Sequence, residues 1–462
     1  MPLRIANAAG FLGDWLDAPR RLVEAAPVDY LTLEYLAELT LSILARQREK
    51  NPAAGYAEDF LEVLPSLTKT LRNQPQLKII TNAGGMNPIA CARAAAKILH
   101  QNGLGHFKIG VVTGDDIRDQ IAKWQAAGEP FVNLDTGESL STLSESPSTL
   151  TNLTVSANAY LGARPIVKAL AEGANIVITG RVADASLTLG PAVHEFGWGW
   201  DDWDKLAGAS VAGHLIECGA QVTGGYSDRW RGHNLSDVGY PIAELNDDGS
   251  CTITKPNGTG GIVDRMTVVS QLVYEIGDPA HYLTPDVDCD FTTVAVRDVG
   301  PDRVAVEGST GRPAPKTLKV SLAYRDGYFA SGQLLATGPD CVDKARACGK
   351  IILDRVAAAG FTLVESRVEC LGAGEGVPGI STAQSSLSEV MLRVTARDPQ
   401  RKAVERFTRE FAPLITSGPA GLAGYAAGRP TVRPVFAYWP TLVPREWVAE
   451  QVEVRAAGEW DL

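Results

Sequence analysis

The strongest constraint on the fold is a repeated alternation, in the first half of the chain, of short apolar segments with segments of helical periodicity. Strand–helix repeats build a parallel sheet with helices packed on its faces. This half is therefore predicted to be an α/β domain, a parallel sheet flanked by helices. The segments predicted as strands are residues 29–35, 78–81, 108–113, 157–161 and 175–179.

The loops that follow these strands are the first place to look for a ligand. In open α/β sheets, ligands lie outside the carboxyl ends of the parallel strands. Three loops with polar or glycine residues follow predicted strands, at residues 82–85, 113–116 and 179–184. We therefore expect these three loops to converge on one crevice.

The sequence changes character from about residue 286. Residues 317–324 and 328–337 flank Asp326-Gly327, a dipeptide typical of a β-hairpin turn. The whole order is β-β-α-β-β-α-β, which predicts a small two-layer α+β domain. We place the α/β domain at 1–285 and the α+β domain at 286–462. The other expected elements are helices 341–359 and 403–416 and strands 362–370, 390–396 and 432–438.

Composition and charge narrow the class of protein. The chain has 462 residues, of which 45% are apolar, and this size predicts two domains. A net charge of −11 without a basic run argues against nucleic acid as a partner. Because no signal sequence and no stretch of roughly 20 apolar residues is present, we expect a soluble cytoplasmic protein without a membrane partner. Seven scattered cysteines predict free thiols.

A glycine turn, Asn82-Ala-Gly-Gly85, joins the strand at 78–81 to the next helix. Glycines allow positive φ and close backbone approach, and the free N–H groups at a helix N-terminus favour an anion. Asn82, Gly84 and Gly85 are therefore candidate ligand-binding residues. The alternative is a simple strand-to-helix turn with Asn87 as N-cap, which requires no ligand.

A second candidate loop lies in VITGRVADASL, residues 177–187, directly after a predicted strand. Arg181 can bind a carboxylate or phosphate through two hydrogen bonds, while Asp184 acts as a base or an orienting group. Thr179 and Gly180 are candidate ligand contacts in the same loop. The alternative is an ion pair between Arg181 and Asp184, with Asp184 capping the next helix.

The segment ASVAGHLIECGAQVTGGYSDRW contains the third candidate group. On a helix His214, Glu217 and Cys218 share one face, so His214 and Glu217 can form a proton-transfer pair. A metal site with Cys218 is the alternative, although no zinc-ligand spacing is present. The glycine-rich exit from this helix suits either a C-cap or ligand contacts. Its candidate ligand-binding residues are Gln221, Thr223 and Gly225.

Other familiar signatures are weak or missing. KPNGTGG, residues 255–261, has the composition of a phosphate-binding loop but not the spacing of one, so an ordinary loop is predicted. The sequence has no GxSxG or HExxH motif, which removes support for a serine hydrolase or a zinc protease.

Five separated segments in order resemble the acyclic terpene utilisation family of the AtuA type. They are RIANAAGFLGDWLDAP, DYLTLEYLAELTLSILARQR, TNAGGMNP, ITGRVADASL and GHLIECGAQVTGG. The C-terminal part resembles the small ferredoxin-like domain that accompanies this family. The resemblance implies a role in the breakdown of acyclic terpenes or related branched acids through CoA thioesters, and it assigns no catalytic residue.

The residues and the resemblance together favour a hydratase or lyase that acts on an acyl-CoA or a carboxylic acid. A CoA thioester has phosphates that suit glycine-rich helix N-termini, and its chemistry needs a base and oxyanion donors. His214, Glu217, Asp184 and Arg181 are the catalytic candidates, with no redox cofactor and no predicted metal site. A non-catalytic subunit that binds acyl-CoA or stabilises a partner enzyme, and a metal-assisted hydrolase, are the alternatives. A homo-oligomer is compatible with the sequence.

Overall fold

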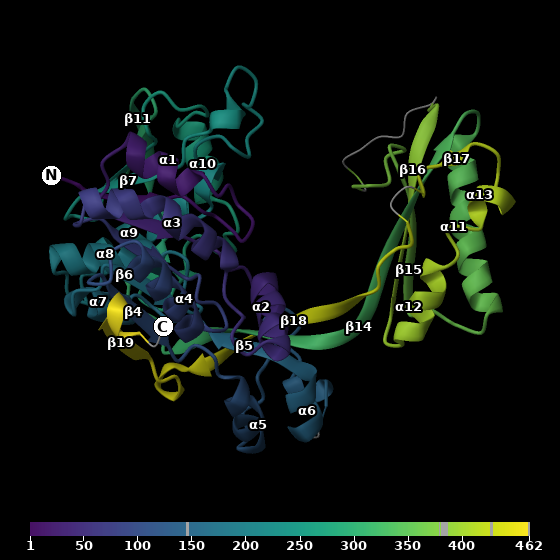
Figure 1. Ribbon diagram of the computed structural model, residues 1–462, viewed down its shortest axis with the longest axis horizontal. Helices are drawn as coiled ribbons and strands as arrows, with labels where there is room; N and C mark the ends of the chain where they lie inside the picture. Colours follow the sequence, from purple (N-terminus) through teal and green to yellow (C-terminus); the bar gives the residue numbers. More distant parts are fainter. Residues whose placement is uncertain (145–146, 378, 380–386, 426–427, 461–462) are drawn as a thin grey trace. The chain divides into compact units, whose positions relative to one another are not determined.

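The computed structural model describes residues 1–144, 147–377, 379, 387–425 and 428–460 (Figure 1). The chain forms two compact units. The first comprises Met1–Ala323 and Tyr438–Leu462, and the second comprises Tyr324–Ala437. Residue 285, where the sequence predicts the join, lies inside the first unit, because later strands still extend the large sheet of that unit.

The first unit is built on a ten-stranded sheet whose five central strands are parallel. The expected purely parallel sheet is thus a mixed sheet, because antiparallel strands extend both edges. The central strands, in spatial order, are β1 (Leu3–Asn7), β2 (Tyr30–Leu33), β3 (Lys78–Thr81), β6 (Ile176–Thr179) and β4 (Lys108–Thr113). The edge strands are β19 (Gln451–Ala456) beside β4, and β7 (Ile242–Leu245), β8 (Cys251–Thr254), β12 (Arg303–Glu307) and β11 (Ala295–Gly300) beyond β1.

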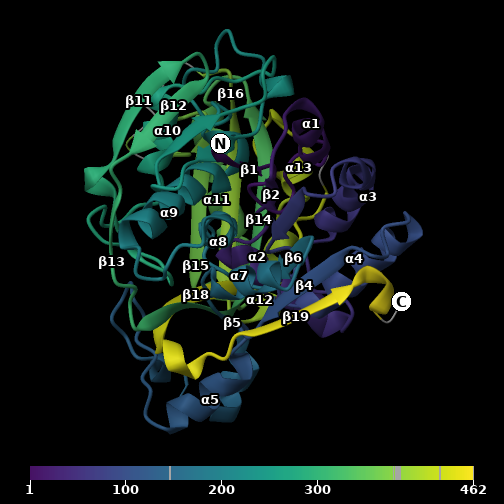
Figure 2. The ribbon, with the colours of Figure 1, turned by 90° about the vertical axis from the view of Figure 1, so that its left-hand side faces the viewer.

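Alternate residues of the central strands enter two separate apolar cores, as the two-residue repeat of a strand requires. Ile79 belongs to the core under α1, α3 and α4, whereas Ile80 belongs to the core under α7, α8 and α9. Figure 2 shows these two helix groups on opposite sides of the strands. Their bounds are α1 (Ala18–Ala25), α3 (Glu58–Asn73), α4 (Pro88–Gln101), α7 (Arg164–Ala171), α8 (Ser186–Phe196) and α9 (Trp203–Glu217).

One predicted strand does not belong to this sheet. Residues 157–161 were expected to pair with the parallel strands, but β5 (Thr154–Ala159) pairs with β14 (Thr317–Thr337). The Tyr160 N–H donates to the Lys319 carbonyl just beyond β5. Local periodicity cannot choose a strand's partner, and here the partner comes from much later in the chain.

Further elements surround the sheet. A small three-stranded sheet packs against α9 and consists of β9 (Tyr282–Leu283), β10 (Asp288–Asp290) and β13 (Thr310–Arg312). The remaining helices of the first unit are α2 (Glu38–Lys50), α5 (Arg118–Ala126), α6 (Pro147–Leu153) and α10 (Arg265–Leu272).

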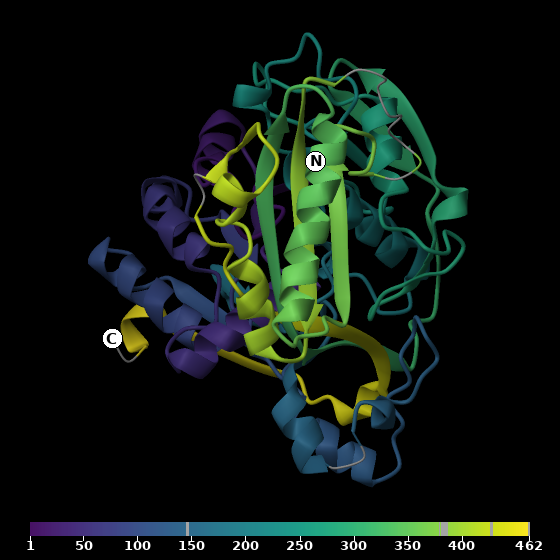
Figure 3. The same cartoon turned by 90° about the vertical axis from the view of Figure 1, so that its right-hand side faces the viewer.

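The second unit is an antiparallel sheet with helices on one face, and Figure 3 shows α11, the long green helix, running along the strands in front of them. It is therefore a two-layer α+β unit. Its strands, besides β14, are β15 (Glu365–Leu371), β16 (Glu389–Asp398), β17 (Leu422–Ala423) and the start of β18 (Arg433–Pro444). Its helices are α11 (Cys341–Ala358), α12 (Arg401–Thr408) and α13 (Leu414–Ser417).

The predicted hairpin around Asp326-Gly327 is wrong. Residues 317–337 form the single strand β14, which runs through this dipeptide. The Tyr328–Thr337 part pairs with β16 instead of folding back on residues 317–324. Asp326 forms an ion pair with Arg397 of β16, so the turn-like dipeptide is held within the strand by its neighbour.

Two expectations from composition can be compared with the structure. All seven cysteines are free thiols, as predicted. In the part of the chain that the structure describes, no helix combines the length and apolar character needed to span a membrane.

Candidate functional site

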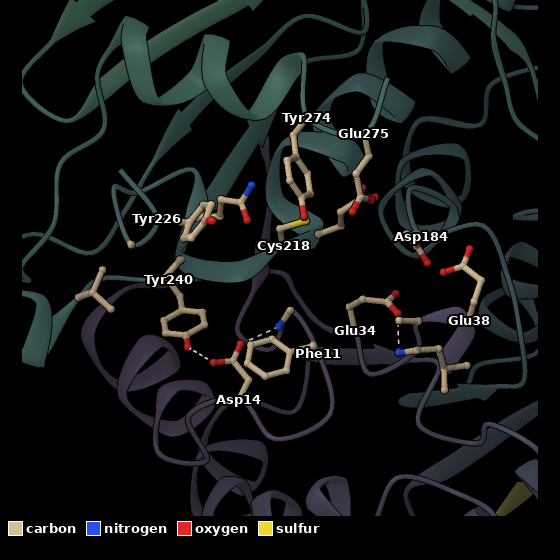
Figure 4. A pocket seen from close by; sticks show the side chains of 18 of the residues that line it. Phe11, Asp14, Glu34, Glu38, Asp184, Cys218, Tyr226, Tyr240, Tyr274 and Glu275 are labelled. Carbon is tan, nitrogen blue, oxygen red and sulfur yellow. Dashed lines mark hydrogen bonds between the residues drawn. The ribbon is translucent and has the colours of Figure 1, made fainter. Parts of the chain in front are cut away.

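A cavity of 520 Å³ lies where loops after the parallel strands meet the end of α9 (Figure 4). The loop after β1 contributes Asp14, the segment after β2 contributes Glu34 and Glu38, and the loop after β6 contributes Asp184. The cavity therefore lies at the carboxyl edge of the sheet, where ligands bind in this class of fold. Its other lining residues are Gly10, Phe11, Leu36, Ala37, Arg181, Glu217, Cys218, Ala220, Gln221, Gly225, Tyr226, Leu235, Val238, Tyr240, Tyr274 and Glu275.

The three loops lie in contact with one another, but only the loop after β6 lines the cavity. A Cβ atom built on Gly84 would lie 2.5 Å from the Thr179 carbonyl oxygen, so the loops after β3 and β6 touch. The loop after β4 joins them because the Arg181 N–H donates to Asp115 at 2.8 Å. Asp115 also accepts a hydrogen bond from Asn158, which fixes its buried carboxylate.

The glycine turn after β3 is packed against protein. Asn82, Gly84 and Gly85 are buried and do not line the cavity. Gly84 has no room for a side chain between Thr179 and the start of α4, and Gly85 adopts a positive φ of 51°. Asn87 caps α4 by accepting from the Ala90 N–H. These contacts explain the glycines through packing and turn geometry.

Arg181 is the central buried cation of the site, with 2% of its side chain exposed. Its guanidinium lies 2.9 Å from Asp184, donates to the Leu36 carbonyl at 2.6 Å, and stacks over the Tyr160 ring at 4.2 Å. Burial alone would lower the pKa of Arg181, but Asp184 and the surrounding acidic groups raise it. Arg181 therefore stays charged and sets the electrostatics of the wall.

Two carboxyl groups beside Arg181 are shifted toward their neutral forms. Burial raises the pKa of Glu34, and the negative charge of Asp184 raises it further. Burial also raises the pKa of Asp184, against the opposing effect of Arg181. Asp184 keeps about a third of its side chain exposed to the cavity while protein encloses its remaining sides, so it can reach a ligand.

Glu38 has the opposite tendency. Burial would raise its pKa, but a 2.7 Å hydrogen bond from the Tyr160 hydroxyl and the charges of Arg181 and Lys319 lower it overall. Lys319 Nζ lies 3.5 Å from Glu38 Oε1. Glu38 is therefore an ionised carboxylate at neutral pH, held at the start of α2.

His214 and Glu217 form the contact that their spacing on α9 predicts. His214 is 2% exposed, and its Nδ1 lies 3.0 Å from Glu217 Oε1. Its Nε2 lies 3.0 Å from the Gln271 carbonyl oxygen, which can only accept, so Nε2 carries a proton. The Nδ1–Oε1 contact then needs one more proton, located on either His214 or Glu217.

The titration of this pair follows from its burial. Burial raises the pKa of Glu217 to about 7, although His214 opposes the shift. Burial alone would lower the pKa of His214, but Glu217 raises it overall. The two groups titrate as a coupled pair that can store and release a proton near neutral pH.

A second cavity, of 260 Å³, adjoins this wall. His214 lines the second cavity, next to Tyr160 and Tyr282. Both cavities therefore reach the same acid–base groups from two directions. The residues common to both are Glu38, Arg181, Asp184, Glu217 and Glu275.

The other sequence candidates divide into two groups. Gln221 and Gly225 line the first cavity. Thr179, Gly180 and Thr223 lie outside the lining of both cavities, and the Thr223 hydroxyl donates to the Gly239 carbonyl. Cys218 lines the first cavity, where burial raises its pKa to about 12, so its thiol is protonated.

No cluster of three or more His, Cys, Asp or Glu side chains is arranged to hold a metal ion among the residues that the structure describes.

Sequence reasoning missed Asp14, Glu34, Glu38 and Tyr160. Asp14 is positioned by a 2.5 Å hydrogen bond from the Tyr240 hydroxyl. A signal for Glu34 existed, because it directly follows the strand Tyr30–Leu33. The carboxyl-edge rule would have selected it if that predicted strand had ended at Leu33 rather than at residue 35.

The fold and the cavity define a mixed α/β protein with a cavity rich in carboxyl groups at the carboxyl edge of its sheet. The model of the acyclic terpene utilisation family protein AtuA matches residues 3–454. The chain therefore belongs to the acyclic terpene utilisation family, which confirms the resemblance seen in its sequence. No curated protein and no solved structure matches the chain.

Proposed function

We propose that this protein catalyses the addition or elimination of water on a branched acyclic substrate of terpene breakdown, carried as an acyl-CoA thioester or a free acid. The observation that carries the proposal is the pair of differently tuned acids, Glu217 and Asp184, on one wall reached by both cavities. Two carboxyl groups with separate environments suit an acid and a base in one reaction.

Burial raises the pKa of Glu217 to about 7, and this suits the acid role at neutral pH. In the elimination direction, Asp184 removes a proton from the carbon next to the carbonyl group, and those electrons form the carbon–carbon double bond. The bond to the hydroxyl group breaks, and Glu217 donates the proton with which it leaves as water. Hydration is the reverse, and His214 returns or takes the proton through Nδ1.

The lining favours the thioester over the free acid, because a thioester is uncharged at the reacting end. Six lining residues of the first cavity are Asp or Glu, whereas Arg181 is the one Arg or Lys among them. An anion would meet repulsion there, so the phosphates of a CoA thioester would stay outside. Phe11 and Tyr226 line the same cavity while 56% and 82% exposed, and they suit a branched apolar chain.

A non-catalytic acyl-CoA-binding subunit is the second candidate. His214 has both ring nitrogens engaged and packs against Tyr282 and Phe291, with ring centroids at 5.6 and 5.5 Å. Such a group also fits a purely structural role. On this alternative the cavity binds its ligand and no bond changes.

The test is conversion of a panel of branched, unsaturated acyl-CoA thioesters and free acids, followed by mass spectrometry. The wild type should change one substrate by the mass of one water, and Asp184→Asn should lower the rate by about 10²-fold or more. Glu62→Gln, on the exposed face of α3, is the matched control and should keep the wild-type rate. Binding without conversion would support the subunit, and loss of activity with a chelator would support a metal-assisted hydrolase.

A further inference from the structure

Glu34 is a buried carboxyl group to which the sequence motifs assign no role. It follows β2, is 4% exposed, and lines the first cavity. Figure 4 shows it on the same side of the cavity as Glu38 and Asp184. A carboxyl group this buried is normally paired with a cation or protonated.

The two oxygens of Glu34 have different surroundings. Oε1 accepts hydrogen bonds from the Asn82 side-chain amide and, at 2.8 Å, from the Leu36 N–H. Oε2 is buried and has no hydrogen-bond partner among the described residues. A negative charge shared by both oxygens would leave Oε2 without a donor, whereas a proton on Oε2 would remove that charge.

Arg181, the cation that acts on Glu34 electrostatically, forms its ion pair with Asp184. Arg181 directs its guanidinium to Asp184 and to the Leu36 carbonyl. The groups that act on Glu34 electrostatically include Arg181 and the like charge of Asp184. Glu38 and Glu217 add two further carboxyl groups to the same cavity wall. An ionised Glu34 would compete with Asp184 for Arg181.

We propose that Glu34 is a positioning residue that holds a proton at neutral pH, and that its neutral form leaves Arg181 paired with Asp184. Its consequence for catalysis rests on the proposed function, because Asp184 is the base there. Asn82 becomes the group that fixes Glu34, since its amide donates to Glu34 while its oxygen accepts from the Tyr35 N–H at 2.8 Å.

The test compares thermal unfolding of the wild type, Glu34→Gln and Glu38→Gln between about pH 4 and about pH 8. Glutamine copies a neutral carboxyl group in shape. A carboxyl group whose folded pKa is raised binds more protons folded than unfolded, so it costs stability as pH rises above its unfolded value. The Tm of Glu34→Gln relative to that of the wild type should therefore increase as pH rises. At about pH 8 the variant should match or exceed the Tm of the wild type.

Glu38→Gln is the matched control with the opposite sign. The pKa of Glu38 is lowered, so its charge stabilises the fold above the unfolded value, and this contribution is lost as pH falls. The Tm of Glu38→Gln should decrease relative to that of the wild type as pH rises, and it should be lower by about 1–2 °C at about pH 8. The proposal is overturned if Glu34→Gln shows the same slope as Glu38→Gln.

A second measurement does not depend on how well Glu34→Gln folds. Infrared spectra of Glu217→Gln with isotope-labelled glutamate should keep a protonated-glutamate carbonyl band at about pH 8, where an ordinary glutamate is ionised. Absence of that band would overturn the proposal. Neither measurement uses a substrate, so either can fail while the proposed reaction stands.

Discussion

His214 Nδ1 and Glu217 Oε1 lie 3.0 Å apart on α9 and share one proton, because His214 Nε2 is committed to the Gln271 carbonyl. The two residues consequently respond differently to substitution. Glu217→Gln keeps a hydrogen-bonding group of the same shape beside His214. His214→Asn removes a ring packed against Tyr282 and Phe291 and the side-chain hydrogen bond to the Gln271 carbonyl, which still accepts from the Tyr274 N–H.

We expect His214→Asn to lower the free energy of unfolding by about 2–4 kcal/mol, through the lost packing and the lost hydrogen bond to the Gln271 carbonyl. Glu217→Gln should cost about 1 kcal/mol or less. Chemical denaturation of both variants checks this. Equal losses would contradict the distinct roles assigned to the two residues.

The rate of water elimination should fall as pH rises through about 7. Burial raises the pKa of Glu217 to about 7, and the acid form that protonates the leaving hydroxyl exists below that value. A pH profile of kcat on the best substrate measures the falling limb, which reports the coupled pair rather than Glu217 alone. A rate that rises through this range would assign Glu217 the role of base.

Arg181→Lys should lower the free energy of unfolding by about 3 kcal/mol. A lysine keeps the charge but cannot reach both the Leu36 carbonyl and Asp184 in the geometry of the guanidinium fork. Arg20→Lys is the control, because the Arg20–Glu24 pair is surface-exposed and should contribute about 0–1 kcal/mol. Similar denaturation midpoints for both variants would refute the buried role of Arg181.

Gly84→Ala should destabilise the fold more than Gly103→Ala. The Cβ at residue 84 would meet the Thr179 carbonyl at 2.5 Å, which predicts a loss of about 3 kcal/mol. Gly103 has a φ of 72° and open space around it, so alanine there meets backbone strain of about 1 kcal/mol. Thermal unfolding of the two variants tests this prediction. A smaller loss of stability for Gly84→Ala than for Gly103→Ala would mean that the turn can accommodate a side chain at residue 84.

Those parts of the site that depend on local spacing could be predicted from the sequence. The His214–Glu217 contact follows from three residues of helical separation, and the Arg181–Asp184 ion pair lies within one loop. The carboxyl-edge rule predicted that the loops after β3, β4 and β6 lie close together. The parallel core of the sheet followed from the strand–helix alternation.

The other features of the site and fold depend on contacts between segments that are far apart in the sequence. Tyr160 reaches Glu38 because β5 pairs with β14, and no local pattern records that partner. Asp326-Gly327 has the composition of a turn, yet pairing with β16 keeps it inside a strand. The Asn82 amide donates to Glu34, whose burial only the assembled fold creates.

The most direct test of the central claim is incorporation of heavy oxygen from labelled water into the converted substrate, measured by mass spectrometry for the wild type and Glu217→Gln at matched folded concentrations. The account predicts one labelled oxygen per hydrated product and a rate at least about 10²-fold lower in Glu217→Gln. Conversion by Glu217→Gln at the wild-type rate, or a product without label, would contradict it.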